Sequence, residues 1–276
     1  MSVTEQTVHP TADVHPIDHL LRADRLPHIL CPGCGIGIVI HSYAQAIAES
    51  GMPENDHVCV SGIGCSGRAA GYVNVDSYHT THGRALPFAL GIAVHKPDLN
   101  VTVISGDGDL TAIGGNHLIH AARRNANLNV ICINNFNYGM TGGQVGPTTP
   151  IGARGSTAPR GTTERPFNLP YLAKATGAVF VARWTILHVR EFQQAILRSM
   201  QKKGFCFIEV LAPCPTSFGR ANKIGDGLHE MEIYRERCRI EHGASNFEDL
   251  DIDLIDDKKS ITVGNFVDIE REAFLS

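Results

Sequence analysis

The sequence of 276 residues lacks features that would place it in several other classes of protein. It has no block of lysine and arginine, and its formal net charge is −4, which argues against a nucleic-acid-binding surface. No apolar run approaches the length needed to span a membrane. The N-terminal stretch MSVTEQTVHPTADVHP lacks the apolar core of a signal peptide. We therefore expect a cytoplasmic protein that binds neither nucleic acid nor membrane.

The eight cysteines are not expected to form disulfides, because structural disulfides are rare in cytoplasmic proteins. Some lie inside apolar strand-like runs, where a free cysteine behaves as a small hydrophobic residue. A second group shares a position in glycine- or proline-rich loops: Cys31, Cys34, Cys65 and Cys214. The CPGC pair alone is compatible with a thiol redox pair, half a zinc site or half an iron–sulfur site.

The stretch from Val101 to Gln144 has the pattern of a strand, a helix and a second strand. Val101–Ile104 and Leu128–Ile133 are short apolar runs rich in β-branched residues, as in buried strands. The segment between them has apolar residues at helical spacing. A connection of this kind makes the two strands parallel, so the sequence predicts an α/β fold.

Asp107 and Asn135 follow the two predicted strands directly, where open parallel sheets bind small molecules. Carboxylate and amide oxygens suit Mg²⁺, and the neighbouring glycines let backbone N–H groups approach a diphosphate. The GDG sequence by itself could also form a tight turn without a ligand. A dinucleotide site fits less well, because GDGDLT lacks the third glycine of GxGxxG.

Two further groups of polar side chains are candidates for a site. His79, His82 and Arg84 could contact a carboxylate substrate or a diphosphate, although a hydrogen-bonded surface loop would have the same composition. The four loop cysteines can converge on one sheet edge, where four thiolates would suit either a zinc ion or a 4Fe–4S cluster.

We expect residues 1–25 to form an N-terminal arm, 26–216 the binding domain and 217–276 a charged tail or clamp, with a short strand near 261–270.

The motifs together resemble the β subunit of the 2-oxoacid:ferredoxin oxidoreductases, most like the 2-oxoglutarate members. They are LPHILCPGCGIG, SGIGCSGR, THGRALP, SGDGDL, INNFNYGMTGGQ and the proline-flanked Cys214, within about residues 26–216. The resemblance implies a thiamine-diphosphate-binding fold. This fold would be a doubly wound, mostly parallel sheet with helices on both faces, followed here by an irregular C-terminal tail.

The resemblance also implies three cofactors: thiamine diphosphate, Mg²⁺ and one 4Fe–4S cluster. Asp107, Asn135 and the backbone carbonyl of Asn137 would bind Mg²⁺. The cluster ligands would be Cys31, Cys34, Cys65 and Cys214. The other residues expected to contact thiamine diphosphate are Gly64, Ser66, Gly106, Gly108, Asp109, Gly139, Met140 and Thr141, together with Cys65. His79, His82 and Arg84 would be the catalytic contacts.

The implied activity is the reversible oxidative decarboxylation of 2-oxoglutarate to succinyl-CoA, with coenzyme A as acyl acceptor and ferredoxin as electron acceptor. Pyruvate or branched-chain 2-oxo acids are alternative substrates. The chain departs from some pyruvate enzymes at Ile36, where those have a cofactor-contacting glutamate. It also shows no evident glutamate for the aminopyrimidine ring, which an α subunit would supply. A non-redox thiamine-dependent decarboxylase or synthase subunit, or a zinc-stabilised interaction subunit, would be the other possibilities.

Overall fold

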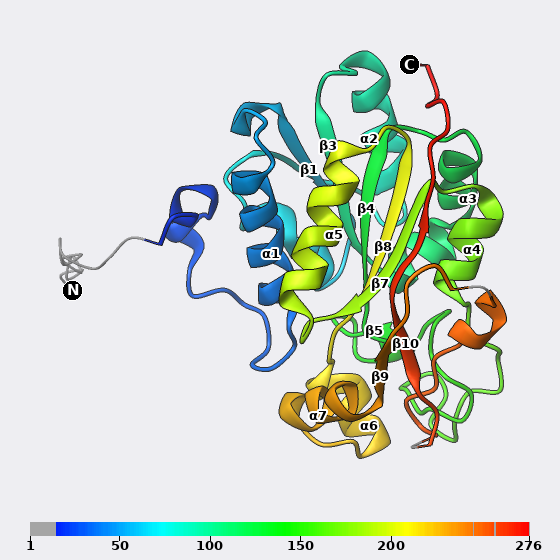
Figure 1. Ribbon diagram of the computed structural model, residues 1–276. Helices are drawn as coiled ribbons and strands as arrows, with labels where there is room; N and C mark the ends of the chain where they lie inside the picture. The colour runs from blue at the N-terminus through cyan, green and yellow to red at the C-terminus, as the bar shows by residue number, and fades with distance from the viewer. Residues whose placement is uncertain (1–14, 245, 257, 276) are drawn as a thin grey trace, which may run out of the picture.

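The computed structural model describes residues 15–244, 246–256 and 258–275, and its centre is an eight-stranded sheet. The order of the strands across the sheet is β2-β1-β3-β4-β8-β7-β10-β9 (Figure 1). The strands of this sheet are β1 His57–Ser61, β2 Asp76–His79, β3 Asn100–Gly106, β4 Leu128–Asn134, β7 Phe180–Thr185, β8 Phe205–Leu211, β9 Cys238–Ile240 and β10 Ile261–Asp268. A separate small hairpin pairs β5 Asn137–Tyr138 with β6 Gln144–Val145.

The strands from β2 through β7 run parallel to one another, which confirms the prediction of a mostly parallel sheet. Every residue of the central strands β4 and β8 is buried. Their near-continuous apolar sequences are typical of parallel strands that are covered on both faces. The last two strands break the pattern, since β10 lies antiparallel to β7 and β9 lies parallel to β10.

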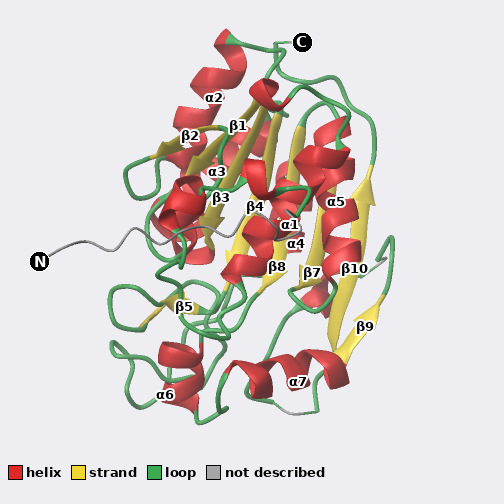
Figure 2. Ribbon diagram, turned by 90° about the vertical axis from the view of Figure 1, so that its left-hand side faces the viewer, coloured by secondary structure: helices red, strands yellow, loops and turns green. Residues whose placement is uncertain are grey.

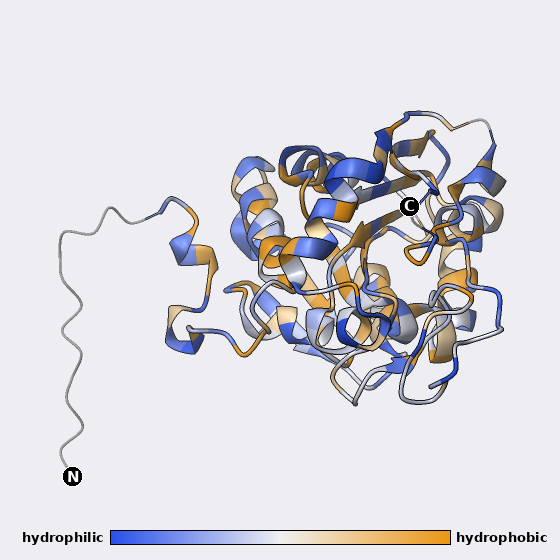
Figure 3. Cartoon of the chain, turned by 90° about the horizontal axis from the view of Figure 1, so that it is seen from below, coloured by the Kyte–Doolittle hydropathy of each residue, from blue (hydrophilic) through white to orange (hydrophobic). Residues whose placement is uncertain are grey.

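Helices cover both faces of the sheet, as predicted (Figure 2). Apolar side chains of α1 and α5 belong to one core cluster, and those of α2, α3 and α4 belong to another. The helices are α1 Ile36–Glu49, α2 Ala85–His95, α3 Gly115–Arg123, α4 Leu169–Thr176, α5 Val189–Gln201, α6 Arg220–Asn222 and α7 Gly227–Arg237. Seen from below, several of the helices carry both hydrophilic and apolar stretches (Figure 3).

Short helical turns connect several of these elements. The 3-10 turns are Asp18–Leu20, Ala23–Arg25, Glu54–Asp56, Ser66–Gly71 and Phe247–Leu250. Two segments are π-helical, η5 Asp109–Ile113 and η6 Pro215–Gly219. In the described part of the chain, no helix combines the length and apolar character needed to cross a membrane.

The stretch after residue 216 is more regular than expected, because it contributes α7, β9 and β10. The predicted strand near 261–270 is β10, and its side chains Ile261, Val263 and Phe266 are buried. Residues 1–14 of the expected N-terminal arm lie outside the described residues.

A buried ion pair connects this C-terminal stretch to the sheet. Arg183 on β7 and Glu209 on β8 are register partners, and their Nε and Oε2 atoms are 2.6 Å apart. Both side chains are only 1% exposed. Arg183 also donates to the carbonyl of Leu250 at 2.7 Å, and Glu209 accepts from the amide of Asn134 at 2.6 Å. The pair therefore joins β7, β8, the end of β4 and the C-terminal stretch.

We expect Arg183→Met to destabilise the protein by about 3–5 kcal/mol, because Glu209 would remain buried without its cation. The loss would appear as a lower apparent melting temperature of the purified native protein. Replacing both partners, R183M together with E209M, should recover part of the loss, since no unpaired charge is then buried. A double variant less stable than R183M would contradict this account.

Candidate active site at the carboxyl edge of the sheet

The predicted metal-binding residues lie side by side because their strands are paired. Gly106, the last residue of β3, is the register partner of Ile133 on β4. Asp107 therefore leaves the sheet beside the turn that contains Asn135. This turn is held by Phe136, which has a positive φ of 62° and is 1% exposed. Its carbonyl accepts a hydrogen bond from Thr149 at 2.6 Å, so the polar side chains after β4 have a fixed direction.

A cavity of about 190 Å³ opens at this edge. Every residue that the sequence predicted to contact the cofactor lines it, from the loops after β1, β3 and β4. The lining also includes Ile63, His82 and Tyr138. Ile63 and Tyr138 were not predicted, although both lie inside motifs that were recognised. The Tyr138 hydroxyl donates to the carbonyl of Gly108 at 3.4 Å, and so it closes the cavity across the β3 loop.

Asp107 is buried at the inner end of the cavity and is 2% exposed. The pKa of its carboxyl group is raised to about 7, mainly by burial and to a smaller extent by the negative charge of Glu209. Hydrogen bonds from the Thr148 hydroxyl and from the backbone of Gly108 act in the opposite direction. A cation at this position would restore the ionised form that burial disfavours.

Asn137 connects the turn after β4 to one of the loop cysteines. Its amide nitrogen donates to the carbonyl of Asn135 at 2.8 Å, and its side-chain oxygen lies 3.7 Å from the Cys214 sulfur. Gly139 also lies close to the cysteines, since a Cβ there would stand 3.3 Å from the sulfur of Cys214 and 3.7 Å from that of Cys65. The cofactor turn and the cysteine loops are therefore in direct contact.

The four loop cysteines surround a second cavity of about 270 Å³. Burial raises the pKa values of Cys34 and Cys65, and the other cysteines raise them further, to about 11 for Cys65. Among the described residues, no three His, Cys, Asp or Glu side chains are grouped so that they could hold one metal ion. The thiols are instead distributed around the space between them. This cavity and the first one share four lining residues: Cys65, Asn135, Gly139 and Met140.

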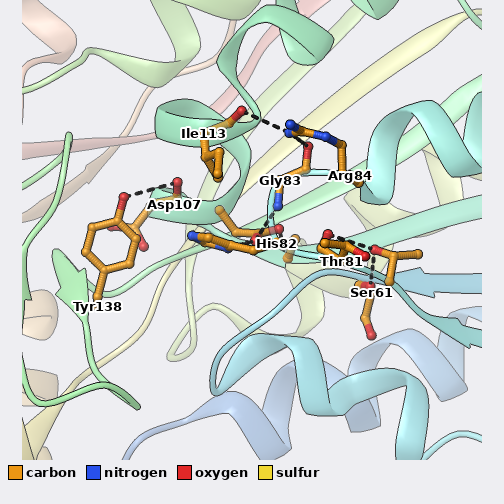
Figure 4. A network of polar contacts seen from close by, with 12 residues as sticks. Ser61, Thr81, His82, Gly83, Arg84, Asp107, Ile113 and Tyr138 are labelled. Atoms are coloured by element: carbon orange, nitrogen blue, oxygen red, sulfur yellow. Dashed lines mark hydrogen bonds and ion pairs between the residues drawn. The ribbon is translucent and has the colours of Figure 1, made fainter.

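His82 is the only one of the three predicted catalytic residues that lines the cofactor cavity. Its Nδ1 is hydrogen-bonded to a carboxylate oxygen of Asp109. Its ring lies near Tyr138 and Asp107 (Figure 4). His79 instead bonds through Nδ1 to the carbonyl of Gly67 at 2.9 Å. Arg84 donates to the backbone carbonyls of Gly83 and Ile113, at 3.2 Å and 3.4 Å, and does not line the cavity. Catalytic roles for His79 and Arg84 stay predictions.

Comparison with known proteins identifies the class of this site. Residues 62–210 match the family model of the thiamine pyrophosphate enzymes, C-terminal TPP binding domain. The chain thus belongs to the thiamine pyrophosphate enzyme family, and the matched segment contains both Asp107 and Asn135.

Full-length relatives define the family more narrowly. The 2-oxoglutarate synthase subunit KorB of Methanocaldococcus jannaschii is 47% identical over 95% of each chain. That of Archaeoglobus fulgidus is 53% identical over 80% of this chain and 82% of its own. The structure of the 2-oxoglutarate:ferredoxin oxidoreductase from Magnetococcus marinus, with 2-oxoglutarate, coenzyme A and succinyl-CoA bound, superposes with a TM-score of 0.82. It is 28% identical, and the match covers 96% of this chain and 89% of that one.

The chain belongs to the family of 2-oxoacid:ferredoxin oxidoreductase β subunits, among the 2-oxoglutarate synthase subunits. The resemblance found in the sequence is thereby confirmed.

The close contact between Gly108 and Tyr138 predicts a sensitive position in the cavity wall. A Cβ at residue 108 would lie 2.3 Å from the ring of Tyr138, which must then move. We expect Gly108→Ala to weaken thiamine diphosphate binding by about tenfold or more, equivalent to about 1.4 kcal/mol, measured by calorimetry. Gly115→Ala is the matched control, because a Cβ there meets nothing within 4 Å. Unchanged affinity in the Gly108 variant would contradict this expectation, because the Tyr138 ring would then have moved aside without narrowing the cavity.

Proposed function

We propose that this chain is the cofactor-binding subunit of a 2-oxoglutarate:ferredoxin oxidoreductase that works with an α subunit in the cytoplasm. The enzyme would convert 2-oxoglutarate and coenzyme A to succinyl-CoA and carbon dioxide and pass the electrons to ferredoxin. The main support for this proposal is that the two cavities share part of their lining, including Cys65 and Asn135. It would place a thiamine cofactor directly beside an electron acceptor, as an oxidative decarboxylase requires. The names of the relatives and the ligands of the solved structure support the substrate.

The first cavity fits thiamine diphosphate and Mg²⁺ by the chemistry of its donors. Asp107 offers a buried carboxylate, Asn135 an amide oxygen and Asn137 a backbone carbonyl, which are hard oxygen ligands for Mg²⁺. Flanking glycines expose backbone N–H groups to a diphosphate. When bound, thiamine diphosphate supplies an electron sink for decarboxylation. The side chains named here would hold its diphosphate end, and His82 would face the reacting end.

The second cavity fits a 4Fe–4S cluster by its size and its thiols. Four thiols line one cavity, and their sulfur atoms are spread around it: those of Cys31, Cys34, Cys65 and Cys214. Burial raises the pKa values of Cys34 and Cys65, and the positive charge of bound iron would favour their thiolate forms. A bound cluster can accept electrons singly.

The α subunit would complete the cofactor cavity. Two apolar side chains in its lining are partly exposed, Ile63 at 37% and Met140 at 45%. A related chain from Saccharolobus solfataricus is named as a β subunit, which supports the need for a partner. We expect much of the substrate contact to come from that partner.

The proposal predicts about four iron and four acid-labile sulfide ions per chain in the native complex purified without oxygen. Its EPR spectrum should show a reduced cluster after addition of 2-oxoglutarate and coenzyme A. Iron without a response to 2-oxoglutarate, but with one to pyruvate or a branched-chain 2-oxo acid, would change the substrate. Zinc in place of iron, or no metal at the cysteines, would overturn the proposed electron path.

Separate loss of the two cofactors tests the assignment of the two cavities. We expect Asp107→Asn to weaken thiamine diphosphate binding at least ~100-fold, about 2.7 kcal/mol, while iron is retained. Cys31→Ser should lose most of the iron and keep measurable thiamine diphosphate binding. Cys238→Ser is the matched control, because Cys238 is a thiol on β9 that lines neither cavity. Loss of iron in the Cys238 variant, or full iron in the Cys31 variant, would refute the cluster assignment.

A further inference from the structure

We propose that Asp109 is a positioning residue that holds His82 with its Nε2 lone pair toward the cofactor cavity. This inference rests on the proposed function and adds to it a role for Asp109, which the sequence had suggested as a contact to thiamine diphosphate. Its basis is the set of hydrogen bonds around one buried carboxylate at the junction of three loops.

The carboxylate of Asp109 is 3% exposed and both of its oxygens are occupied by the protein. Oδ1 accepts from the backbone N–H of Gly83 at 2.9 Å and is bonded to Nδ1 of His82. Oδ2 accepts from the hydroxyl of Ser105 at 2.6 Å. The loop after β1 packs directly over this group, because a Cβ at Gly62 would come within 1.9 Å of Oδ2. A cofactor therefore cannot reach Oδ2 from that side.

The backbone around Asp109 is shaped to hold the carboxylate in place. Asp109 begins the π-helix η5, and its carbonyl accepts the N–H of Gly114 at 3.1 Å. Single π-helical turns are frequent at functional sites. Gly83 has a positive φ of 70°, and a Cβ there would lie 2.5 Å from Ile113. The loop that carries His82 is thus pressed against η5, which sets the distance between the histidine and Asp109.

The carboxylate determines which nitrogen of His82 carries the proton. An ionised carboxylate only accepts hydrogen bonds, so Nδ1 must donate to it. In a neutral imidazole, Nε2 is then the acceptor. The ring lies beside Tyr138, with centroids 6.2 Å apart, and extends toward Asp107 (Figure 4). Since His82 lines the cofactor cavity, its Nε2 lone pair is available there to accept a proton or a hydrogen bond.

The test uses the purified complex of both subunits, with 2-oxoglutarate, coenzyme A and ferredoxin. We expect Asp109→Asn to lower kcat roughly 100-fold, within the range of general acid–base contributions. The KM for 2-oxoglutarate, the affinity for thiamine diphosphate and the iron content should stay close to wild type. Asp98→Asn is the matched control, because Asp98 is exposed beyond the opposite ends of the strands. A loss of thiamine diphosphate affinity that matches the loss of kcat would overturn the inference in favour of a direct cofactor contact.

Double variants separate action through His82 from any independent effect. His82→Gln should lower kcat to a similar degree, and Asp109→Asn added to it should cause no further loss, since residues that act as a unit are not additive. Additive losses would show that Asp109 does not act through His82. If Asp109→Asn does not fold, Ser105→Ala supplies the same test. It should lower kcat several-fold in the wild type and not in the His82→Gln background, and an equal loss in both would overturn the inference.

The same measurements distinguish failure of this inference from failure of the proposed function. Full activity of His82→Gln, with thiamine diphosphate binding still dependent on Asp107, would remove the role of Asp109 and leave the function intact. Thiamine diphosphate binding that does not depend on Asp107 would overturn the function itself.

Discussion

Parallel pairing of β3, β4 and β8 brings the loops that follow them to one edge of the sheet. Asp107 follows β3, Asn135 follows β4 and Cys214 lies just beyond β8, so residues far apart in sequence become neighbours. The loop after β1, with Cys65, reaches the same edge because β1 pairs with β3. A shift in any of these registers would separate the two cavities. The buried apolar strands are thus the condition on which the geometry of the site depends.

Burial at this edge raises the pKa values of acidic groups and so disfavours their ionised forms when no positive charge is nearby. The pKa of Asp107 is raised to about 7 and that of Cys65 to about 11, in each case first by burial. Metal ions bound at these groups would stabilise the ionised forms, and the free energy of binding would then add to the stability of the fold. Asn137 and Gly139 lie between the two sets of ligands, so ordering of one loop favours ordering of the other.

The sequence was sufficient for the parts of the site that depend on strand order. Asp107 and Asn135 could be found because polar residues at the ends of buried parallel strands meet, and the motifs added the cysteines. The roles of Asp109 and Arg84 could not be found in this way. Asp109 bonds to His82 at the start of a π-helical segment, and Arg84 donates to the backbone carbonyls of Gly83 and Ile113. The hydrogen-bond partners of these two side chains do not follow from hydrophobic periodicity. β10 was recognised, but its antiparallel place beside β7 depends on pairing between distant residues.

The two aspartates of the GDGD sequence differ in what their carboxylates contact. Asp107 would bind a cation, and Asp109 would position His82. Asp107 keeps a carboxylate beside the cavity, held by a hydroxyl from the 145–168 loop, where a cation can reach it. Asp109, two positions later, has both oxygens bonded to the protein. Asp109 is the first residue of a π-helical turn, and its carboxylate bonds to the neighbouring loop through His82 and Gly83. A Cβ at Gly83 would lie 2.5 Å from Ile113, so the last residue of this turn also lies against the loop that carries His82. Both ends of the π-helical turn therefore contact the loop that holds the histidine.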